Sequence, residues 1–220
     1  MPALENSKLL TNIFLKRNDP REVLISIDKK KLIELKKDSI VGTSSLRREF
    51  QIKRLRKDLK FKLIRGNVDT RLKKLEDGLY DAIILSFAGI KSLMKEGKVS
   101  EKFSTSSIVP SAGQGIIALQ CRKNDKDIIT LLKNINDRNT CVQAQAERSV
   151  LKVLGGDCET AVGVHATIED DNLLLEAELF SLDGTERFYE KKSSKLIEAE
   201  VLGKEVGKLL KIKSKNSYKR

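Results

Sequence analysis

The stretch Val-Gly-Thr-Ser-Ser-Leu-Arg-Arg at residues 41–48 decides the fold of this chain. It reads as a buried strand that ends in small polar residues and continues into a helix. A second stretch of the same kind, Ile-Arg-Gly-Asn-Val-Asp-Thr-Arg, occupies residues 64–71. Each brings backbone N–H groups, a helix N-terminus and arginine side chains around one volume, which suits a carboxylate or a phosphate. Two such stretches predict a ligand with several anionic groups.

Strands and helices alternate on both sides of these stretches. We predict strands at residues 22–27, 39–43, 60–64 and 81–86, and helices at residues 30–37, 45–56, 68–76 and 88–94. This alternation indicates βαβ units and a mainly parallel sheet with right-handed crossovers. Ligands of such sheets bind beyond the carboxyl ends of the strands, where both stretches lie.

The pattern changes in the second half of the chain. A linker rich in serine and proline precedes a strand through Cys121 and a helix at residues 126–132. A long helix is expected at residues 140–154. Hairpin-linked strands are expected at residues 162–168, 173–181 and 186–191, and a last helix at residues 194–210. The basic residues 211–215 read as a disordered tail. The predicted fold class is therefore α/β with a mainly parallel sheet, followed by a small α+β domain.

Amino-acid composition narrows the classes of partner that this chain is expected to bind. The 220 residues contain 43 Lys and Arg against 31 Asp and Glu, and the resulting net charge of +12 favours anionic partners. Nucleic acid is the weaker choice, because no aromatic side chains accompany the basic runs. Three scattered cysteines and one histidine predict neither a metal site nor a disulfide framework. There is no run of about 18 apolar residues and no basic-then-apolar leader, so we expect a cytoplasmic protein without a membrane span.

Each candidate residue also has a plain interpretation. Residues 43–48 could be an ordinary capped helix start, but two arginines there oppose the helix dipole and call for a nearby anion. Arg65 could lie in a simple βα turn, although a charge at the end of an apolar strand needs a partner. Cys158 follows two glycines, which suits a reactive thiolate, whereas Cys121 and Cys141 read as buried apolar side chains.

Six motifs in this order resemble one known family. They are the two stretches above, followed by Tyr-Asp-Ala-Ile-Ile-Leu, Ala-Gly-Ile-Lys, Ala-Gly-Gln-Gly and Gly-Gly-x-Cys at residues 80–85, 88–91, 112–115 and 155–158. The chain closely resembles the porphobilinogen deaminases, also called hydroxymethylbilane synthases. The resemblance implies a periplasmic-binding-protein-like second domain and a small α+β third domain. It divides the chain into a remnant of the first domain and hinge (1–17), the α/β anion-binding domain (18–112), a return segment of the first domain (113–135) and the α+β cofactor-attachment domain (136–220).

The resemblance also implies the chemistry. Cys158 would hold a dipyrromethane cofactor through a thioether, and four porphobilinogen units would be condensed on it with loss of ammonia. Hydrolysis would release the linear tetrapyrrole hydroxymethylbilane, which feeds porphyrin and haem biosynthesis. Arg65 and Arg48 would bind the substrate. The matching positions for the cofactor carboxylates are Thr43, Ser44, Ser45, Arg47, Arg48 and Arg71. Each porphobilinogen unit carries two carboxylates, so the growing chain that the resemblance implies needs many planar donor forks, in agreement with the arginines of the two stretches.

The chain also departs from the family. The Lys-Asp pair that carries the family's catalytic carboxylate would immediately precede Met1, so we identify no catalytic residue, and Ser92 stands where many members have arginine. We expect a fragment of a longer reading frame, a monomer when full length. The alternatives are a truncated protein completed by another polypeptide, an inactive fragment and a non-catalytic binding module for polycarboxylate pyrroles. Without its first domain, the apolar segment 116–119 is expected to be an unpaired edge.

Overall fold

The computed structural model describes residues 8–155 and 160–219 and divides the chain into two compact units. Residues 19–110 form the five-stranded unit, which is described throughout. The described residues up to Asn18 and from Ser111 onward form the helix-pair unit. The two units are taken one at a time.

The five-stranded unit is built on one sheet with strand order β4-β3-β5-β2-β6. β3 runs parallel to β4 and β5, whereas β2 is antiparallel to its neighbours β5 and β6. Four strands therefore point one way and β2 opposes them, which confirms the mainly parallel sheet. The strands are β2 (Glu22–Ser26), β3 (Ile40–Gly42), β4 (Lys60–Lys62), β5 (Ala82–Ser86) and β6 (Glu101–Lys102).

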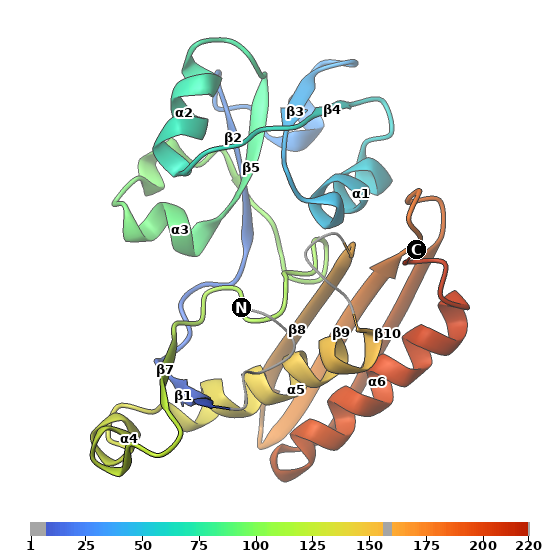
Figure 1. The fold of residues 1–220 in the computed structure, drawn as a ribbon. Helices are drawn as coiled ribbons and strands as arrows, with labels where there is room; N and C mark the ends of the chain where they lie inside the picture. The colour runs from blue at the N-terminus through green and yellow to red at the C-terminus, as the bar shows by residue number, and fades with distance from the viewer. Residues whose placement is uncertain (1–7, 156–159, 220) are drawn as a thin grey trace. The chain divides into compact units, whose positions relative to one another are not determined.

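Helices cover both faces of this sheet (Figure 1). Side chains of β2 alternate between the faces, so that Val23 and Ile25 join the core under α2 (Val68–Glu76) and α3 (Phe87–Ser92). Leu24 joins the opposite core, together with Ile52 of α1 (Leu46–Leu55). These two apolar layers hold the starts of α1 and α2 at the sheet.

The helix predicted at residues 30–37 is wrong in extent. The structure has a single 3₁₀ turn, η1 (Leu32–Glu34), after which the backbone of Leu35 is extended. The guanidinium of Arg56 donates to the carbonyls of Leu32 and Leu35, and it thereby satisfies acceptors that a longer helix would have used itself. A second short turn, η2 (Glu96–Lys98), precedes β6.

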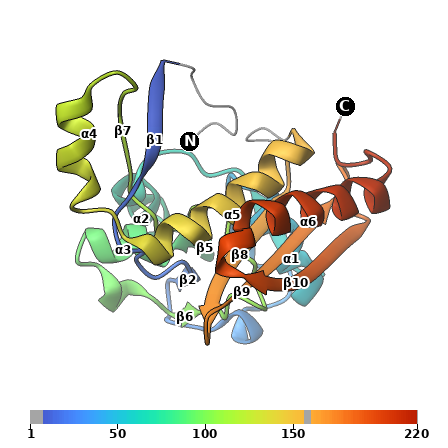
Figure 2. The same cartoon turned by 90° about the horizontal axis from the view of Figure 1, so that it is seen from below.

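The helix-pair unit contains an antiparallel sheet with strand order β10-β9-β8, covered on one face by two helices that lie side by side (Figure 2). The glycines of α6 let it approach α5 closely: a Cβ at Gly203 would lie 2.3 Å from the carbonyl oxygen of Ala146. This sheet and its two helices confirm the predicted small α+β fold. They consist of α5 (Arg138–Leu154), β8 (Val162–Glu169), β9 (Asn172–Phe180), β10 (Arg187–Lys195), η3 (Leu196–Glu198) and α6 (Ala199–Ser214).

The disordered tail predicted at residues 211–215 is also wrong. α6 continues to Ser214, and the following turn leads to Tyr218, whose side chain is only 1% exposed. The Tyr218 hydroxyl donates to the carbonyl of Leu154 at 2.7 Å, at the end of α5. Apolar burial of this tyrosine holds the basic segment in place.

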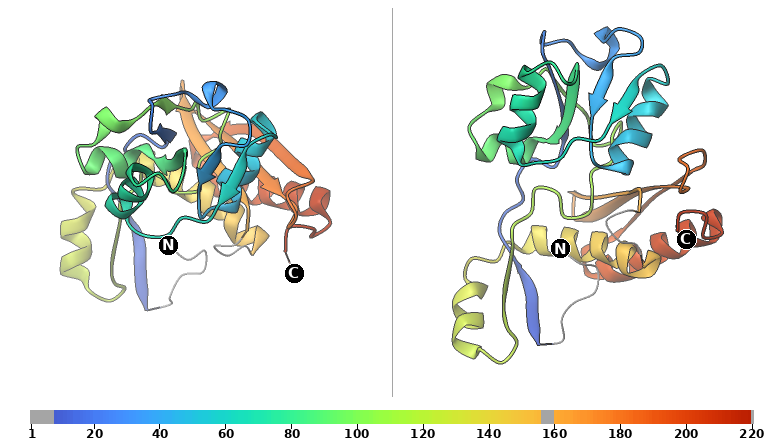
Figure 3. Two further views of the ribbon diagram at one scale, coloured as in Figure 1. Left: turned by 90° about the horizontal axis from the view of Figure 1, so that it is seen from above. Right: turned by 45° about the horizontal axis from the view of Figure 1, so that its top comes forward.

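Residues 116–119 are not an unpaired edge. β7 (Ala118–Arg122) pairs antiparallel with β1 (Leu9–Phe14), and the pairing continues where Leu15 N donates to Ile117 O at 3.0 Å. The helix α4 (Lys126–Lys133) follows β7 and contacts it (Figure 3). The sequence analysis predicted no strand at residues 9–14, so the partner of residues 116–119 was missed.

Candidate functional site

The hydroxyl-bearing residues after β3 build the start of α1. Thr43 is buried, and its Oγ1 accepts a hydrogen bond from Ser45 N at 3.1 Å. The Ser45 side chain caps the helix by accepting from Arg48 N at 3.4 Å. Two of the three predicted hydroxyls therefore shape the turn. Ser44 is exposed, and its Oγ accepts from Arg71 Nη2 at 3.4 Å.

Arg48 and Arg71 come from the first turns of successive helices, α1 and α2, and Arg71 also contacts Ser44. Arg71 Nε donates to the carbonyl of Gly66 at 2.8 Å, which directs its guanidinium back toward the end of the sheet. Burial lowers the pKa of Arg71, and the positive charge of Arg48 lowers it further, so the two guanidiniums lie within electrostatic range. We call Ser44, Arg48 and Arg71 the anion cluster.

Arg48 offers an unused donor in this cluster. Its Nε is buried and has no hydrogen-bond partner among the residues that the structure describes. A buried donor without an acceptor is costly, and so are two neighbouring positive charges. A ligand carboxylate would relieve both costs at once. The chemistry of the cluster therefore fits a carboxylate or another small anion.

Arg47 points into the protein instead. Its side chain is 5% exposed; Nη1 donates to Val109 O at 2.9 Å and Nη2 to Glu22 Oε1 at 2.6 Å. Glu22 also forms an ion pair with Arg48, whose Nη2 lies 2.9 Å from Oε2 without the alignment of a hydrogen bond. Burial alone would raise the pKa of Glu22, but Arg48 and Arg47 outweigh burial and lower it.

Glu22 is the site residue that the sequence analysis missed. It begins an apolar strand and is fully buried. The two arginines at the start of α1 indicated that an anion lies beside them, and for Arg47 that anion is this carboxylate. A glutamate heading an apolar strand, combined with an Arg-Arg pair that opposes a helix dipole, is the signal that could have found it.

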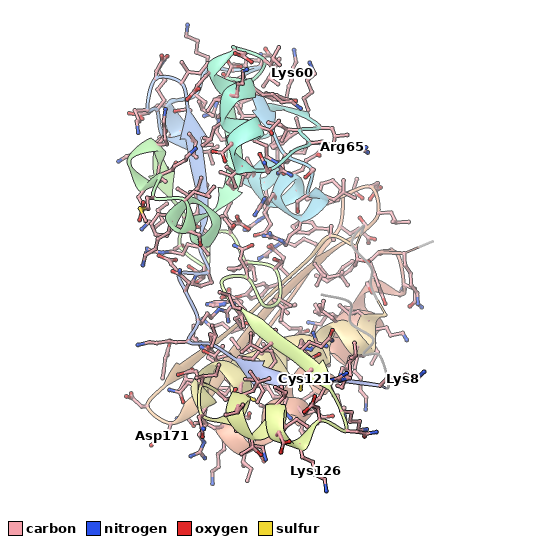
Figure 4. The ribbon with its side chains drawn as sticks, turned by 60° about the vertical axis from the view of Figure 1, so that its left-hand side comes forward. Lys8, Lys60, Arg65, Cys121, Lys126 and Asp171 are labelled. Atoms are coloured by element: carbon pink, nitrogen blue, oxygen red, sulfur yellow. The ribbon has the colours of Figure 1, made fainter. Side chains whose placement is uncertain are left out.

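Arg65 lies outside the anion cluster. β4 ends at Lys62, so Arg65 sits in the following loop rather than at the end of the strand. Its side chain is exposed and extends into solvent (Figure 4). Because water solvates its charge there, Arg65 does not require the anionic partner that was predicted for a position at the end of the strand. The neighbouring Gly66 has φ +119°, and a Cβ there would lie 2.7 Å from the Thr70 side chain, which explains why the turn uses glycine.

The cysteines divide into two groups. Cys158 lies outside the described residues. Cys121, on β7 (Figure 4), and Cys141, on α5, are half-buried rather than core residues. Burial raises the pKa of the Cys141 thiol, which makes it a poor nucleophile.

Within residues 8–155 and 160–219, no group of three or more His, Cys, Asp and Glu side chains is placed to hold a metal ion. Over the same residues, no helix has the length and apolar character needed to cross a bilayer.

A second buried carboxylate, in the helix-pair unit, serves as a reference for Glu22. Glu147 is fully buried, and its Oε1 accepts from Arg17 Nη1 at 2.5 Å and from Ala166 N at 2.8 Å. Gly113 N donates to Oε2 at 2.6 Å. Burial would raise the pKa of Glu147, but Arg17 and His165 outweigh it and lower the pKa. Like Glu22, this side chain is an anion stabilised by arginine.

Comparison with known proteins identifies the family. Residues 1–130 match the porphobilinogen deaminase dipyromethane cofactor binding domain, and residues 141–212 match the porphobilinogen deaminase C-terminal domain. The chain belongs to the porphobilinogen deaminase family. The porphobilinogen deaminase of Coxiella burnetii (strain Dugway 5J108-111) is 43% identical over 184 residues, which cover 84% of this chain and 59% of that protein. The enzyme of Syntrophobacter fumaroxidans is 37% identical over 207 residues, covering 94% of this chain and 67% of the relative.

Solved structures give weaker similarity. A periplasmic binding protein of Salmonella typhimurium matches with a TM-score of 0.36 and 13% identity, over 60% of this chain and 57% of that protein. An ancestral arginine-binding protein matches with a TM-score of 0.35 and 18% identity, over 56% and 55% of the two chains. Scores at this level do not establish a shared fold.

Proposed function

We propose that this chain is the greater part of a hydroxymethylbilane synthase, which condenses four porphobilinogen units with release of ammonia. The observation that carries the proposal is the anion cluster: Arg48 and Arg71 lie within electrostatic range of each other, and the buried Arg48 Nε has no acceptor among the described residues. The cluster lies inside the segment that matches the family's cofactor binding domain.

The residues of the cluster fit a dipyrromethane cofactor. Arg48 and Arg71 would bind its carboxylates, with the exposed hydroxyl of Ser44 beside Arg71, and Cys158 would hold it through a thioether. When bound, the cofactor supplies a covalently anchored acceptor for the incoming pyrroles. Thr43 and Ser45 act indirectly, because their hydroxyls fix the turn that starts α1.

The remaining predicted residues take different roles in this proposal. Arg65 is exposed and free to reach an incoming substrate carboxylate, as the family resemblance implies. Arg47 is bound to Glu22 and Val109, so direct contact with a ligand would require these bonds to break. Its part is therefore to support the cluster from inside the protein.

Intact-mass spectrometry tests the proposal. The chain is incubated with porphobilinogen, and its mass is compared with that of Cys158→Ser. A mass increase of two pyrrole units in the parent, absent from Cys158→Ser, supports the enzyme assignment. An unmodified parent chain contradicts it.

A second candidate is a non-catalytic module that binds polycarboxylate pyrroles. It is favoured by the fact that the anion cluster is contained in one fully described unit. Saturable binding of porphobilinogen without any mass increase would support this candidate over the enzyme. Binding that responds only to salt concentration would instead indicate nonspecific attraction to the net charge of +12.

A further inference from the structure

The carboxylate of Glu22 is shared between two arginines with different surroundings. Oε1 binds Arg47, which is 5% exposed, and Oε2 faces Arg48, which is 13% exposed and belongs to the anion cluster. One negative charge therefore serves two positive charges. Because Glu22 compensates only one of these two charges, the net positive charge that remains lies on the side of Arg48 and Arg71.

Glu22 is held rigidly on its own side. Its backbone lies in β2 between β5 and β6, opposite Ser86, and its carbonyl accepts from Phe103 N at 3.0 Å. Arg47 is fixed as well, because Val109 O accepts from both Arg47 Nη1 and Gln51 Nε2 at 2.9 Å. The carboxylate is thus anchored by the sheet and by a bonded neighbour.

Arg48 has fewer restraints of its own. Apart from Glu22, its guanidinium makes one long hydrogen bond to the residues that the structure describes, from Nη1 to Ile84 O at 3.4 Å. The Nη side of the fork therefore faces Glu22 and the sheet, and Nε remains without an acceptor in the described unit. The contacts of the two Nη atoms with Glu22 and the Ile84 carbonyl therefore set the direction in which Nε points.

We propose that Glu22 is a positioning residue: it holds the Nη side of Arg48 so that Nε and Arg71 can bind one ligand carboxylate together. Glu22 acts through Arg48 and does not touch the ligand. The identity of that ligand rests on the function proposed above.

Replacement by glutamine separates positioning from simple charge. Glu22→Gln removes one negative charge beside the cluster, so Coulomb attraction alone would tighten the binding of an anion. Loss of a fixed Arg48 would weaken it, because a charge-assisted contact needs alignment. We expect Kd for porphobilinogen to rise about tenfold in Glu22→Gln, measured by calorimetric titration of the full chain.

Glu147→Gln is the matched control. Glu147 is equally buried and paired with an arginine, but it lies in the other unit. Both variants should lower the melting temperature, because each leaves an arginine without its carboxylate. Only Glu22→Gln should change Kd.

A second pair of variants covers the case in which Glu22→Gln fails to fold. Arg47→Gln keeps the Glu22–Arg48 ion pair, whereas Arg47→Gln combined with Glu22→Gln removes it without leaving Arg47 as an uncompensated charge. We expect the double variant to bind porphobilinogen about tenfold more weakly than Arg47→Gln. Equal or tighter binding in the double variant would overturn the proposal.

The side-chain NMR signal of Arg48 keeps this proposal separate from the proposed function. The Nε–Hε signal, assigned through Arg48→Lys, should show restricted motion in the parent and in Glu147→Gln, and increased motion in Glu22→Gln. If the parent does not bind porphobilinogen, the proposed function fails, while this signal still decides the role of Glu22. Equal mobility of Arg48 in the parent and in Glu22→Gln would overturn that role.

Discussion

Arg48 and Arg71, on the first turns of α1 and α2, are close enough that the charge of Arg48 adds to burial in lowering the pKa of Arg71. The two guanidiniums carry like charges, so their proximity is a repulsion within the folded protein. Ser44, two residues after β3, contacts Arg71. Such an arrangement is unfavourable until an anion binds, and this property leads to the first prediction.

Phosphate should stabilise the chain through this cluster. At a phosphate concentration 100 times its Kd, the free energy of unfolding should rise by about 2.7 kcal/mol relative to sodium chloride of equal ionic strength. Arg71→Gln should lose most of this gain. Arg122→Gln removes a charge from an exposed ion pair and should keep the gain. Equal stabilisation of all three proteins would show that phosphate acts only as a general salt.

Acid should remove the stabilising contribution of Glu22. The folded-state pKa of this carboxyl lies below its ordinary value of 4.5, so its contribution is present above about pH 4.5 and is lost as the pH falls toward the folded-state value. Urea unfolding of the parent should show falling stability below pH 4.5, and Glu22→Gln should show a smaller decrease. Glu200→Gln, in an exposed pair with Lys204, should follow the parent. A parent and Glu22→Gln with parallel pH profiles would contradict the buried ion pair.

The C-terminal segment should contribute to stability. Tyr218→Phe removes the hydrogen bond to Leu154 O and should cost about 1 kcal/mol, while Tyr218→Ala should cost roughly 3–5 kcal/mol because it also leaves a cavity. Ile212→Ala, at a side chain that is 72% exposed, should change little. Denaturant unfolding measures all three. Unchanged stability in Tyr218→Ala would contradict this packing and favour the disordered tail that the sequence predicted.

Close packing of α5 and α6 should not tolerate a side chain at Gly203. Gly203→Ala places a Cβ 2.3 Å from Ala146 O, so the helices must separate, at a cost of roughly 1–3 kcal/mol. Gly97→Ala meets no atom within 4 Å and should be neutral or slightly stabilising. Thermal unfolding of the two variants decides the point, and a stable Gly203→Ala would mean that the helix spacing is wider than described.

The sequence predicted the elements whose ends carry local signals. The helix predicted at residues 68–76 has these bounds in the structure, because Asn67 caps its start and Asp77 and Gly78 end it. β10 was predicted too short, since residues 192–195 are polar and pair with β9 only through the backbone. The strand at residues 9–14 was missed because its partner, β7, lies more than 100 residues away in sequence.

The sequence predicted only part of the candidate site, because some of its contacts also join residues that are distant in sequence. Hydroxyls and arginines at the helix starts are visible in the local pattern, and the structure brings Ser44, Arg48 and Arg71 together. The inward turn of Arg47 depends on Glu22 and Val109, which are distant in sequence and meet it only through the folded sheet. Long-range pairing of a buried charge leaves little trace in a single sequence.

Calorimetric titration of porphobilinogen into the parent chain, Arg48→Gln and Arg71→Gln tests the central claim most directly. If the two guanidiniums bind one ligand carboxylate together, each variant should weaken binding at least tenfold, and the double variant should lose less than the sum of the two free-energy changes. Unchanged affinity in both single variants would contradict a shared carboxylate site at Arg48 and Arg71.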